Sequence, residues 1–230
     1  MCLLSYVPNA EGGFCLASSR DEDKGREKAI LPREKRIHGK IILFPKDTRG
    51  GGTWMAWSKS QTLVLLNGAL VRYERKSSYR HSRGLVVLNF FKFNTWKSFV
   101  ETYNFDDLEP FRLLLFDNSR SENIKEMIWD GEKLVVREYS NDASHLWCSA
   151  TLYEPDKVES LKASFQEFNA VESGCNTELY DFHAQNTYHN EEIPEVATLS
   201  ISHSKIDKDI VRILFHDLKI DTKQNIRLYS

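Results

Sequence analysis

The feature that most constrains the fold is the order of the apolar segments along the chain. Strand-length apolar runs come first, segments with helical spacing follow, strand runs return, one long amphipathic segment follows, and strand runs end the chain. This order predicts segregated layers, in which antiparallel sheets carry helices on their outer faces. Periodicity alone therefore places the chain in the α+β class.

Turn residues separate many of the expected strands. A glycine pair at residues 12–13 predicts a hairpin between the first two, and Asp130-Gly131 is a strong hairpin signal. The densely charged residues 21–36 are expected to form a solvated loop or a short helix. The expected strands cover residues 2–7, 14–17, 40–44, 53–57, 62–66, 111–116, 126–129, 133–139, 195–202 and 209–215.

Three segments have the spacing of helices. Apolar residues recur at near-helical intervals in residues 85–93 and 96–103, and residues 156–169 form an amphipathic pattern with one apolar face. No internal repeat, low-complexity tract or linker interrupts the chain. We therefore expect residues 1–230 to form a single domain.

Composition excludes several classes of protein. Apolar residues make up 41% of the 230 residues and the formal net charge is −2, which argues against a broad surface for nucleic acid or anionic membranes. No apolar run approaches the roughly 20 residues of a transmembrane helix, and the N-terminus lacks the basic leader of a signal peptide. Because the four cysteines show no CxxC pairing, they fit reduced thiols in a cytoplasmic protein.

Three short motifs are similar to a known family. The chain begins MCLL at residues 1–4, continues with SRDE at residues 19–22 and has GGTW at residues 51–54. This ordered set resembles the NRDE family, the transport and Golgi organisation protein 2-like proteins, with Ser19 in place of the asparagine that begins the family tetrad. Further similar pieces at residues 82–85, 111–117 and 198–201 extend the resemblance over nearly the whole chain.

The resemblance implies a fold and a nucleophile. The family is similar to the N-terminal-nucleophile hydrolases, which implies a four-layer αββα sandwich of two antiparallel sheets between helices. It also makes Cys2 the candidate nucleophile. Once Met1 is removed, Cys2 carries both a thiol and an α-amine with a pKa of roughly 7.7–8, so one residue supplies nucleophile and base. The alternative for Cys2 is an ordinary buried thiol on the first strand.

The charged tetrad supplies the next candidates. A guanidinium at Arg20 would favour the thiolate, and a carboxylate at Asp21 would hold the α-ammonium or orient Arg20. Bile-salt and penicillin-amide hydrolases pair an arginine with an aspartate three residues later, the spacing of Arg20 and Asp23, whereas the family tetrad stresses Asp21 and Glu22. We therefore assign Asp21 a catalytic role and give Glu22 and Asp23 substrate-binding roles. The alternative is a solvated run of charges.

Other candidates follow from the resemblance and from strand ends. Gly52, Thr53 and Trp54 either line the pocket beside Cys2 or form a tight turn into a strand; the segment lacks the pattern of a phosphate-binding loop. Asn67 ends an expected strand, where its amide could stabilise an oxyanion, but Asn-Gly is also a common turn. Ser149 stands where relatives have a Ser-Asn pair, and Ala150 removes the second expected donor.

No metal or cofactor is expected. The polar segment that contains His183, His189, Glu191 and Glu192 matches no structural zinc spacing, so its histidines are predicted to lie at the surface.

Two functions remain open from the sequence. The first is a cysteine hydrolase that cleaves the linear amide C–N bond of a small molecule. The second is a non-catalytic protein that binds or carries haem, a lipid or acyl-CoA and is related to Golgi organisation. Residues Trp54, Trp57, Phe90 and Phe91 could line an aromatic pocket for such a ligand, or pack in the core.

Overall fold

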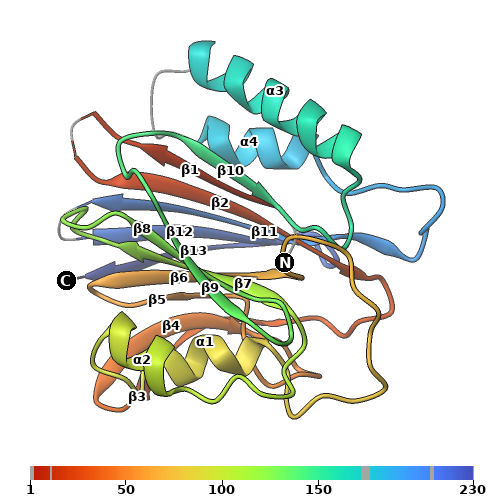
Figure 1. Ribbon diagram of the computed structural model, residues 1–230. Helices are drawn as coiled ribbons and strands as arrows, with labels where there is room; N and C mark the ends of the chain where they lie inside the picture. Colours follow the sequence, from red (N-terminus) through yellow and green to blue (C-terminus); the bar gives the residue numbers. More distant parts are fainter. Residues whose placement is uncertain (1–2, 11, 172–176, 208–209, 230) are drawn as a thin grey trace.

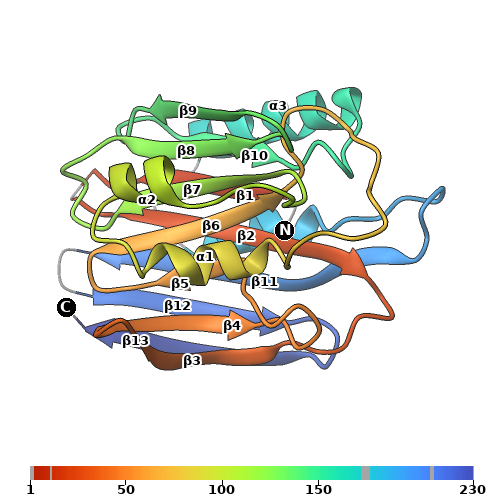
Figure 2. The ribbon, with the colours of Figure 1, turned by 60° about the horizontal axis from the view of Figure 1, so that its bottom comes forward.

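The computed structural model describes residues 3–10, 12–171, 177–207 and 210–229. Over these residues the chain forms two stacked antiparallel sheets, with two helices against the outer face of each (Figures 1 and 2). This arrangement confirms the α+β class expected from the order of apolar segments and the αββα sandwich that the family resemblance implies.

The first sheet has the strand order β10-β1-β2-β11-β12-β13. In this sheet β1 lies between β10 and β2 and pairs with both strands. Leu3 lies opposite Ser19 of β2 and opposite Cys148 of β10. The first described residue of the chain is thereby held between two strands. The strands of this sheet are β1 (Leu3–Pro8), β2 (Phe14–Asp23), β10 (His145–Cys148), β11 (Val196–Asp207), β12 (Ile210–Asp217) and β13 (Thr222–Tyr229).

The second sheet follows the sequence order β3-β4-β5-β6-β7-β8-β9. Alternate residues of both sheets meet in a shared core, which includes Leu4, Phe14, Trp57 and Phe215. The strands of this sheet are β3 (Ile30–Ile37), β4 (Lys40–Lys46), β5 (Met55–Trp57), β6 (Gln61–Asn67), β7 (Phe111–Asp117), β8 (Ile124–Trp129) and β9 (Leu134–Tyr139).

Helices cover the outer faces of both sheets (Figure 1). Helices α1 (Gly84–Phe90) and α2 (Trp96–Thr102) lie on the second sheet, and α3 (Pro155–Val171) and α4 (Glu178–Gln185) lie on the first. Phe90 and Phe99 fill one outer layer, while Phe165 and Phe182 fill the other. Helix α2 starts at a reciprocal capping box between Thr95 and Ser98.

Residues 21–36 depart from the predicted loop or short helix. Strand β2 continues to Asp23, and residues 30–37 form β3 at the edge of the second sheet. Half of the side chains of β3 are charged and exposed, as expected where an edge strand must avoid pairing with other chains. Its strand conformation follows from pairing with β4, a contact that local composition does not reveal.

The cysteines also differ from expectation. Cys15 is disulfide-bonded, whereas Cys148 is a buried free thiol. The expectation of reduced thiols throughout is therefore wrong at Cys15. Spacing along the chain does not show which cysteines a fold brings together.

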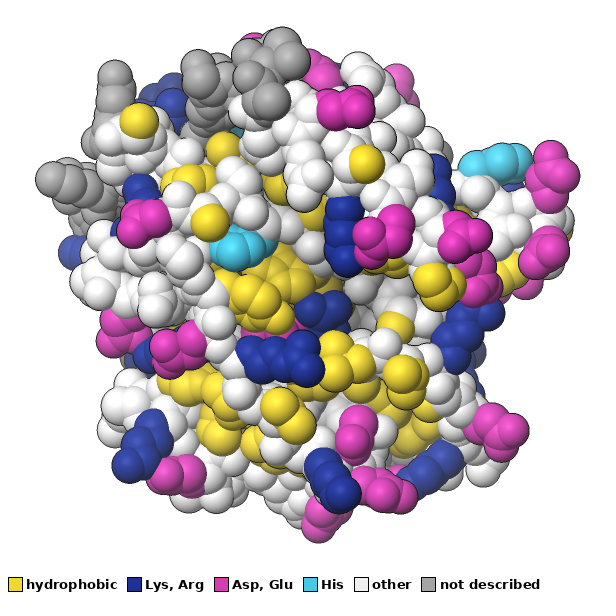
Figure 3. Space-filling model, turned by 45° about the horizontal axis from the view of Figure 1, so that its top comes forward, with side chains coloured by type: hydrophobic (Ala, Val, Ile, Leu, Met, Phe, Trp, Pro, Cys, Tyr) yellow, Lys and Arg dark blue, Asp and Glu magenta, His cyan; other side chains and the backbone are white. Residues whose placement is uncertain are grey.

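Surface charge is mixed over the face shown in Figure 3, where hydrophobic side chains lie among lysine, arginine and acidic side chains. None of the helices in the described ranges is long and apolar enough to cross a bilayer.

Candidate functional site

A polar cleft lies where strands β2 and β6 end. It consists of two adjoining cavities of about 340 and 440 Å³. Both cavities are lined by Glu22, Asn67, Arg75, Arg83 and Glu109. The cleft therefore joins the ends of the two sheets to the long loop that follows β6.

The alternation of β2 sends consecutive tetrad residues to opposite faces. Ser19 bonds to His183 of α4, and Asp21 bonds to Tyr153 just before α3, so both face the helices. Arg20 contacts Asp47 and Trp54 and thus faces the second sheet. Glu22 lies two residues after Arg20, so it points to the same face of the strand, and it lines both cavities.

Arg20 is held rigidly in a buried position. Its Nη2 donates to Oδ2 of Asp47 at 2.6 Å, and its Cζ lies 4.5 Å from the ring centroid of Trp54. Arg26 also contacts Asp47 at 3.0 Å. Burial alone would raise the pKa of Asp47, but the hydrogen bond from the Gly50 amide and the two guanidinium groups hold that pKa below its usual range.

Asp47 was not among the residues singled out from the sequence. It lies 27 positions after Arg20, in a polar segment that carries no motif. The carboxylate that orients Arg20 is therefore Asp47, and neither Asp21 nor Asp23 fills that role. A buried arginine always needs a counter-charge, but the sequence does not show which acidic residue supplies it.

Asp21 is a buried carboxyl with two hydroxyl donors. Thr198 Oγ1 donates to Oδ1 at 2.6 Å and Tyr153 OH donates to Oδ2 at 2.8 Å. A register shift between Thr198 and Ser200 in β11 brings Thr198 opposite Asp21. Burial raises the pKa of Asp21, and these two hydrogen bonds oppose that rise. A nearby cation would stabilise the ionised form of such a buried carboxyl.

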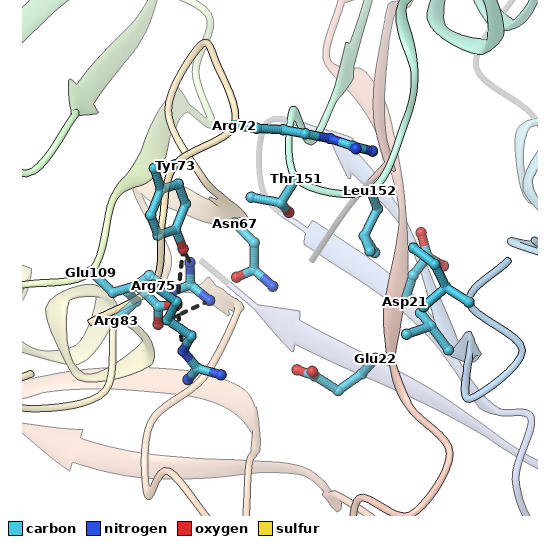
Figure 4. Close-up of a pocket in the computed structure, with 12 residues that line it drawn as sticks. Asp21, Glu22, Asn67, Arg72, Tyr73, Arg75, Arg83, Glu109, Thr151 and Leu152 are labelled. Carbon is cyan, nitrogen blue, oxygen red and sulfur yellow. Dashed lines mark hydrogen bonds and ion pairs between the residues drawn. The ribbon is translucent and has the colours of Figure 1, made fainter. Parts of the chain in front are cut away.

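Glu22 and Asn67 extend into the same open space from opposite sides of the cleft (Figure 4). Within the described part of the chain, neither the Glu22 carboxylate nor the Asn67 amide has a recorded side-chain partner. The Asn67 backbone is fixed, because Ser149 Oγ donates to its carbonyl at 2.6 Å. Gly68 follows with a φ of 75°, so the Asn-Gly turn and an amide directed into the cleft occur together.

The wall opposite Glu22 is a hydrogen-bonded group in which side chains of the loop after β6 contact Glu109, which lies just before β7. Tyr73 OH donates to Glu109 Oε1 at 2.8 Å, and Arg83 donates to Tyr73 and contacts Glu109 (Figure 4). Arg75 adds an ion pair of 3.1 Å to Glu109. Burial raises the pKa of the Tyr73 hydroxyl, so it stays protonated. Sequence analysis missed this wall because its members lie in two loop segments without periodicity.

The glycine-rich segment combines both of its expected roles. Thr53 and Trp54 line the larger cavity. Gly52 packs against the start of α1, where a Cβ would lie 2.2 Å from the carbonyl carbon of Gly84, and Thr53 N donates to the Gly84 carbonyl at 3.0 Å. Gly52 thus supports the wall of the cleft through tight packing and does not line it.

Some predicted residues lie away from the cleft. Asp23 is exposed and accepts a hydrogen bond of 2.6 Å from the Gly25 amide, as in a turn. Among the aromatic candidates, Trp57, Phe90 and Phe91 are buried in the cores, and of the four only Trp54 reaches the cleft.

Cys2 lies outside the described residues. Leu3, which follows it in the sequence, is paired with Ser19, the residue directly before Arg20.

The prediction that His183 lies at the surface is wrong. It lies in α4 and is fully buried, with Nε2 2.8 Å from Ser5 Oγ and Nδ1 2.8 Å from Ser19 Oγ. Burial, with a smaller effect of His203, lowers the pKa of His183 to about 3. Among the residues the structure describes, no group of three or more histidine, cysteine or acidic side chains is arranged to hold a metal ion.

Comparison with known proteins agrees with this fold. The structure of penicillin V acylase from Agrobacterium tumefaciens is similar, with a TM-score of 0.62 and 12% sequence identity over 100% of this chain and 86% of that chain. At that identity the likeness shows the fold alone, which is that of the N-terminal-nucleophile hydrolases. No curated protein matches the sequence. The family model described as Transport and Golgi organisation 2 matches residues 1–220, and the chain belongs to that family.

Proposed function

We propose that this chain, acting as one domain over residues 1–230, is an N-terminal-nucleophile hydrolase that cleaves a linear amide C–N bond. The observation that supports this is the convergence of Arg20, Asp21, Glu22 and Asn67 at the sheet end where Leu3 begins β1. Cys2 directly precedes Leu3 in the sequence. The proposed nucleophile is therefore the sequence neighbour of the residue that begins β1 at this sheet end.

The reaction needs two steps. After removal of Met1, the α-amine of Cys2 takes the thiol proton, and the thiolate attacks the amide carbonyl carbon. A C–S bond forms, the C–N bond breaks, and the leaving amine receives the proton. Water then attacks the thioester, the C–S bond breaks, and a carboxylic acid leaves with the thiol restored.

Each cleft residue has a role that fits its surroundings. Asn67 directs its amide, which bonds to no side chain among the described residues, into the cleft, where the N–H groups stabilise the oxyanion. Glu22, on the other side, accepts a hydrogen bond from the substrate N–H. Asp21 holds the α-ammonium, since a buried carboxyl favours a cationic partner. Arg20, partly neutralised by Asp47, fixes the geometry of the sheet end.

The test compares two cysteines. Intact-mass measurement should show a chain without Met1, and a cysteine-reactive acyl probe should label one site. We expect labelling by the probe and turnover of short-chain linear amides to be lost in Cys2→Ala and kept in Cys148→Ala, which removes a free thiol that is buried. Retention of Met1, or equal labelling of both variants, would contradict the proposal. Titration with haem and with acyl-CoA tests the non-catalytic alternative, because a ligand of the folded state raises the melting temperature.

A further inference from the structure

A third cavity of about 460 Å³ adjoins the polar cleft, and we call it the apolar groove. It runs between the loop after β6 and the start of α3. The groove meets the cleft at Arg72, which lines both. Its lining consists of Ala69, Leu70, Val71, Arg72, Arg112, Cys148, Ala150, Tyr153, Glu154, Pro155, Val158 and Glu159.

The charged residues of the groove are paired. Arg72 contacts Glu154 at 2.5 Å, and the buried Arg112 contacts Glu126 at 2.5 Å. Glu159 contacts Lys162 at 2.9 Å. Because each charge has a counter-charge, the groove offers no unpaired ion to a ligand. Its remaining walls are mostly apolar.

Apolar side chains at the rim are unusually exposed. Leu70 is 47% exposed and Val71 is 72% exposed, and they lie side by side on the loop. Exposed apolar groups that border a cavity are typical of a binding surface. A hydrocarbon that enters the groove would remove both side chains from water.

The groove reaches the strand partner of Leu3, the first described residue of the chain. Cys148, which lines it, is the strand partner of Leu3, the residue after Cys2. The segments that follow β6 and β10 contact each other closely. Ser149 donates to the Asn67 carbonyl, and a Cβ on Gly68 would lie 2.5 Å from Thr151 Cγ2. The polar cleft and the apolar groove thus meet at the start of β1.

We propose that the apolar groove binds the hydrocarbon chain of the substrate's acyl group. This inference rests on the proposed function. The two substituents of an amide leave the carbonyl carbon and nitrogen in opposite directions, so one enters each cavity. Glu22 and the arginines of the cleft suit the polar amine part, whereas the groove suits an unbranched apolar chain. The substrate class is therefore a fatty-acyl amide.

Binding to Cys2→Ala tests the groove without turnover. We expect calorimetry to show that affinity rises from acetamide through hexanamide to decanamide, by about fourfold for each methylene that is buried, since each contributes about 0.8 kcal/mol. Leu70→Glu should weaken decanamide binding at least tenfold. The matched control is Ile220→Glu, which alters a loop residue of the same 47% exposure outside the groove and should bind as Cys2→Ala does.

A second variant checks the shape of the groove. Val158→Trp fills it from the α3 side and should abolish the gain from hexanamide to decanamide while acetamide binding stays unchanged. Chain-length-independent affinity, or equal decanamide binding by Leu70→Glu, would overturn the inference. Conversion of a dimer to a monomer by Leu70→Glu, seen by light scattering with decanamide affinity kept, would also overturn it and identify the rim as a subunit contact. Failure of the proposed function would appear separately, as turnover that survives in Cys2→Ala.

Discussion

The guanidinium of Arg20 donates a 2.6 Å hydrogen bond to Oδ2 of Asp47, although 27 positions separate the two residues in the chain. The pair joins β2 of the first sheet to the segment between β4 and β5 of the second. It therefore couples the two sheets at the cleft.

Asp47→Asn should destabilise the fold strongly. The substitution leaves the buried Arg20 without a full counter-charge, which we expect to lower the free energy of unfolding by about 3 kcal/mol. Urea denaturation measures this change in the free energy of unfolding. As a control, Asp207→Asn removes an ion pair of Arg212 that is substantially exposed and should cost less than about 1 kcal/mol. Equal losses in the two variants would show that burial of the Arg20 pair is unimportant.

Adjacent glycines should respond differently to alanine. A Cβ at Gly52 would lie 2.2 Å from backbone atoms of α1, which cannot move aside, so Gly52→Ala should lower the free energy of unfolding by about 3 kcal/mol. Gly51 has a φ of 71° but open space around its Cβ position, so Gly51→Ala should cost about 1 kcal/mol. Thermal unfolding of both variants measures the two losses of stability. A larger loss in Gly51→Ala than in Gly52→Ala would contradict the tight packing of Gly52 against α1.

His183 should make the fold less stable in acid. Its pKa is about 3 in the folded chain against an ordinary value of 6.5, so the unfolded chain binds the extra proton between these two values. Stability should fall as the pH drops below about 6.5, by up to about 1.4 kcal/mol for each pH unit from this residue.

His183→Gln isolates that contribution. It removes the titrating ring and keeps polar atoms for Ser5 or Ser19, so the slope of unfolding free energy between pH 6.5 and 4 should become shallower. His189→Gln, at an exposed position, should leave the slope as it is. An unchanged slope in His183→Gln would show that this histidine does not govern the acid sensitivity.

Asn67→Ala should reduce the rate of amide cleavage more than substrate binding. Loss of one oxyanion donor typically lowers kcat by about 10²- to 10³-fold. KM should change little, because the amide acts on charge that develops only in the transition state. Steady-state kinetics on a fatty-acyl amide measures both constants, with the exposed Asn94→Ala as a control. A raised KM at constant kcat would assign Asn67 to substrate binding.

The predictability of the fold differs between segments for physical reasons. Continuous apolar runs located β6 and β7, since strands buried on both faces are apolar along most of their length. They missed β3 and β13, because each lies at a sheet edge and exposes at least half of its side chains, and they missed β10, which is only four residues long. Helix α4 was missed as well, since its buried groups include the polar His183.

The candidate site was predictable only in part. The motif located the end of β2 and thus Arg20, Asp21 and Glu22, and the Asn-Gly pair located Asn67. Asp47 and the Tyr73 wall come from loops whose positions depend on tertiary contacts. Asp23, expected in the site from its spacing to Arg20, lies where β2 ends in solvent.

Successive side chains of β2 point to opposite faces of the sheet. Which groups reach the cleft therefore depends on whether a residue's place in the strand is odd or even. One residue inserted between Phe14 and Ser19 would turn the guanidinium toward the helices and the Asp21 carboxyl toward the opposite sheet. Two inserted residues would restore both. Length variation among chains that keep this cleft should therefore fall in the turns, and within β2 it should come only in pairs of residues.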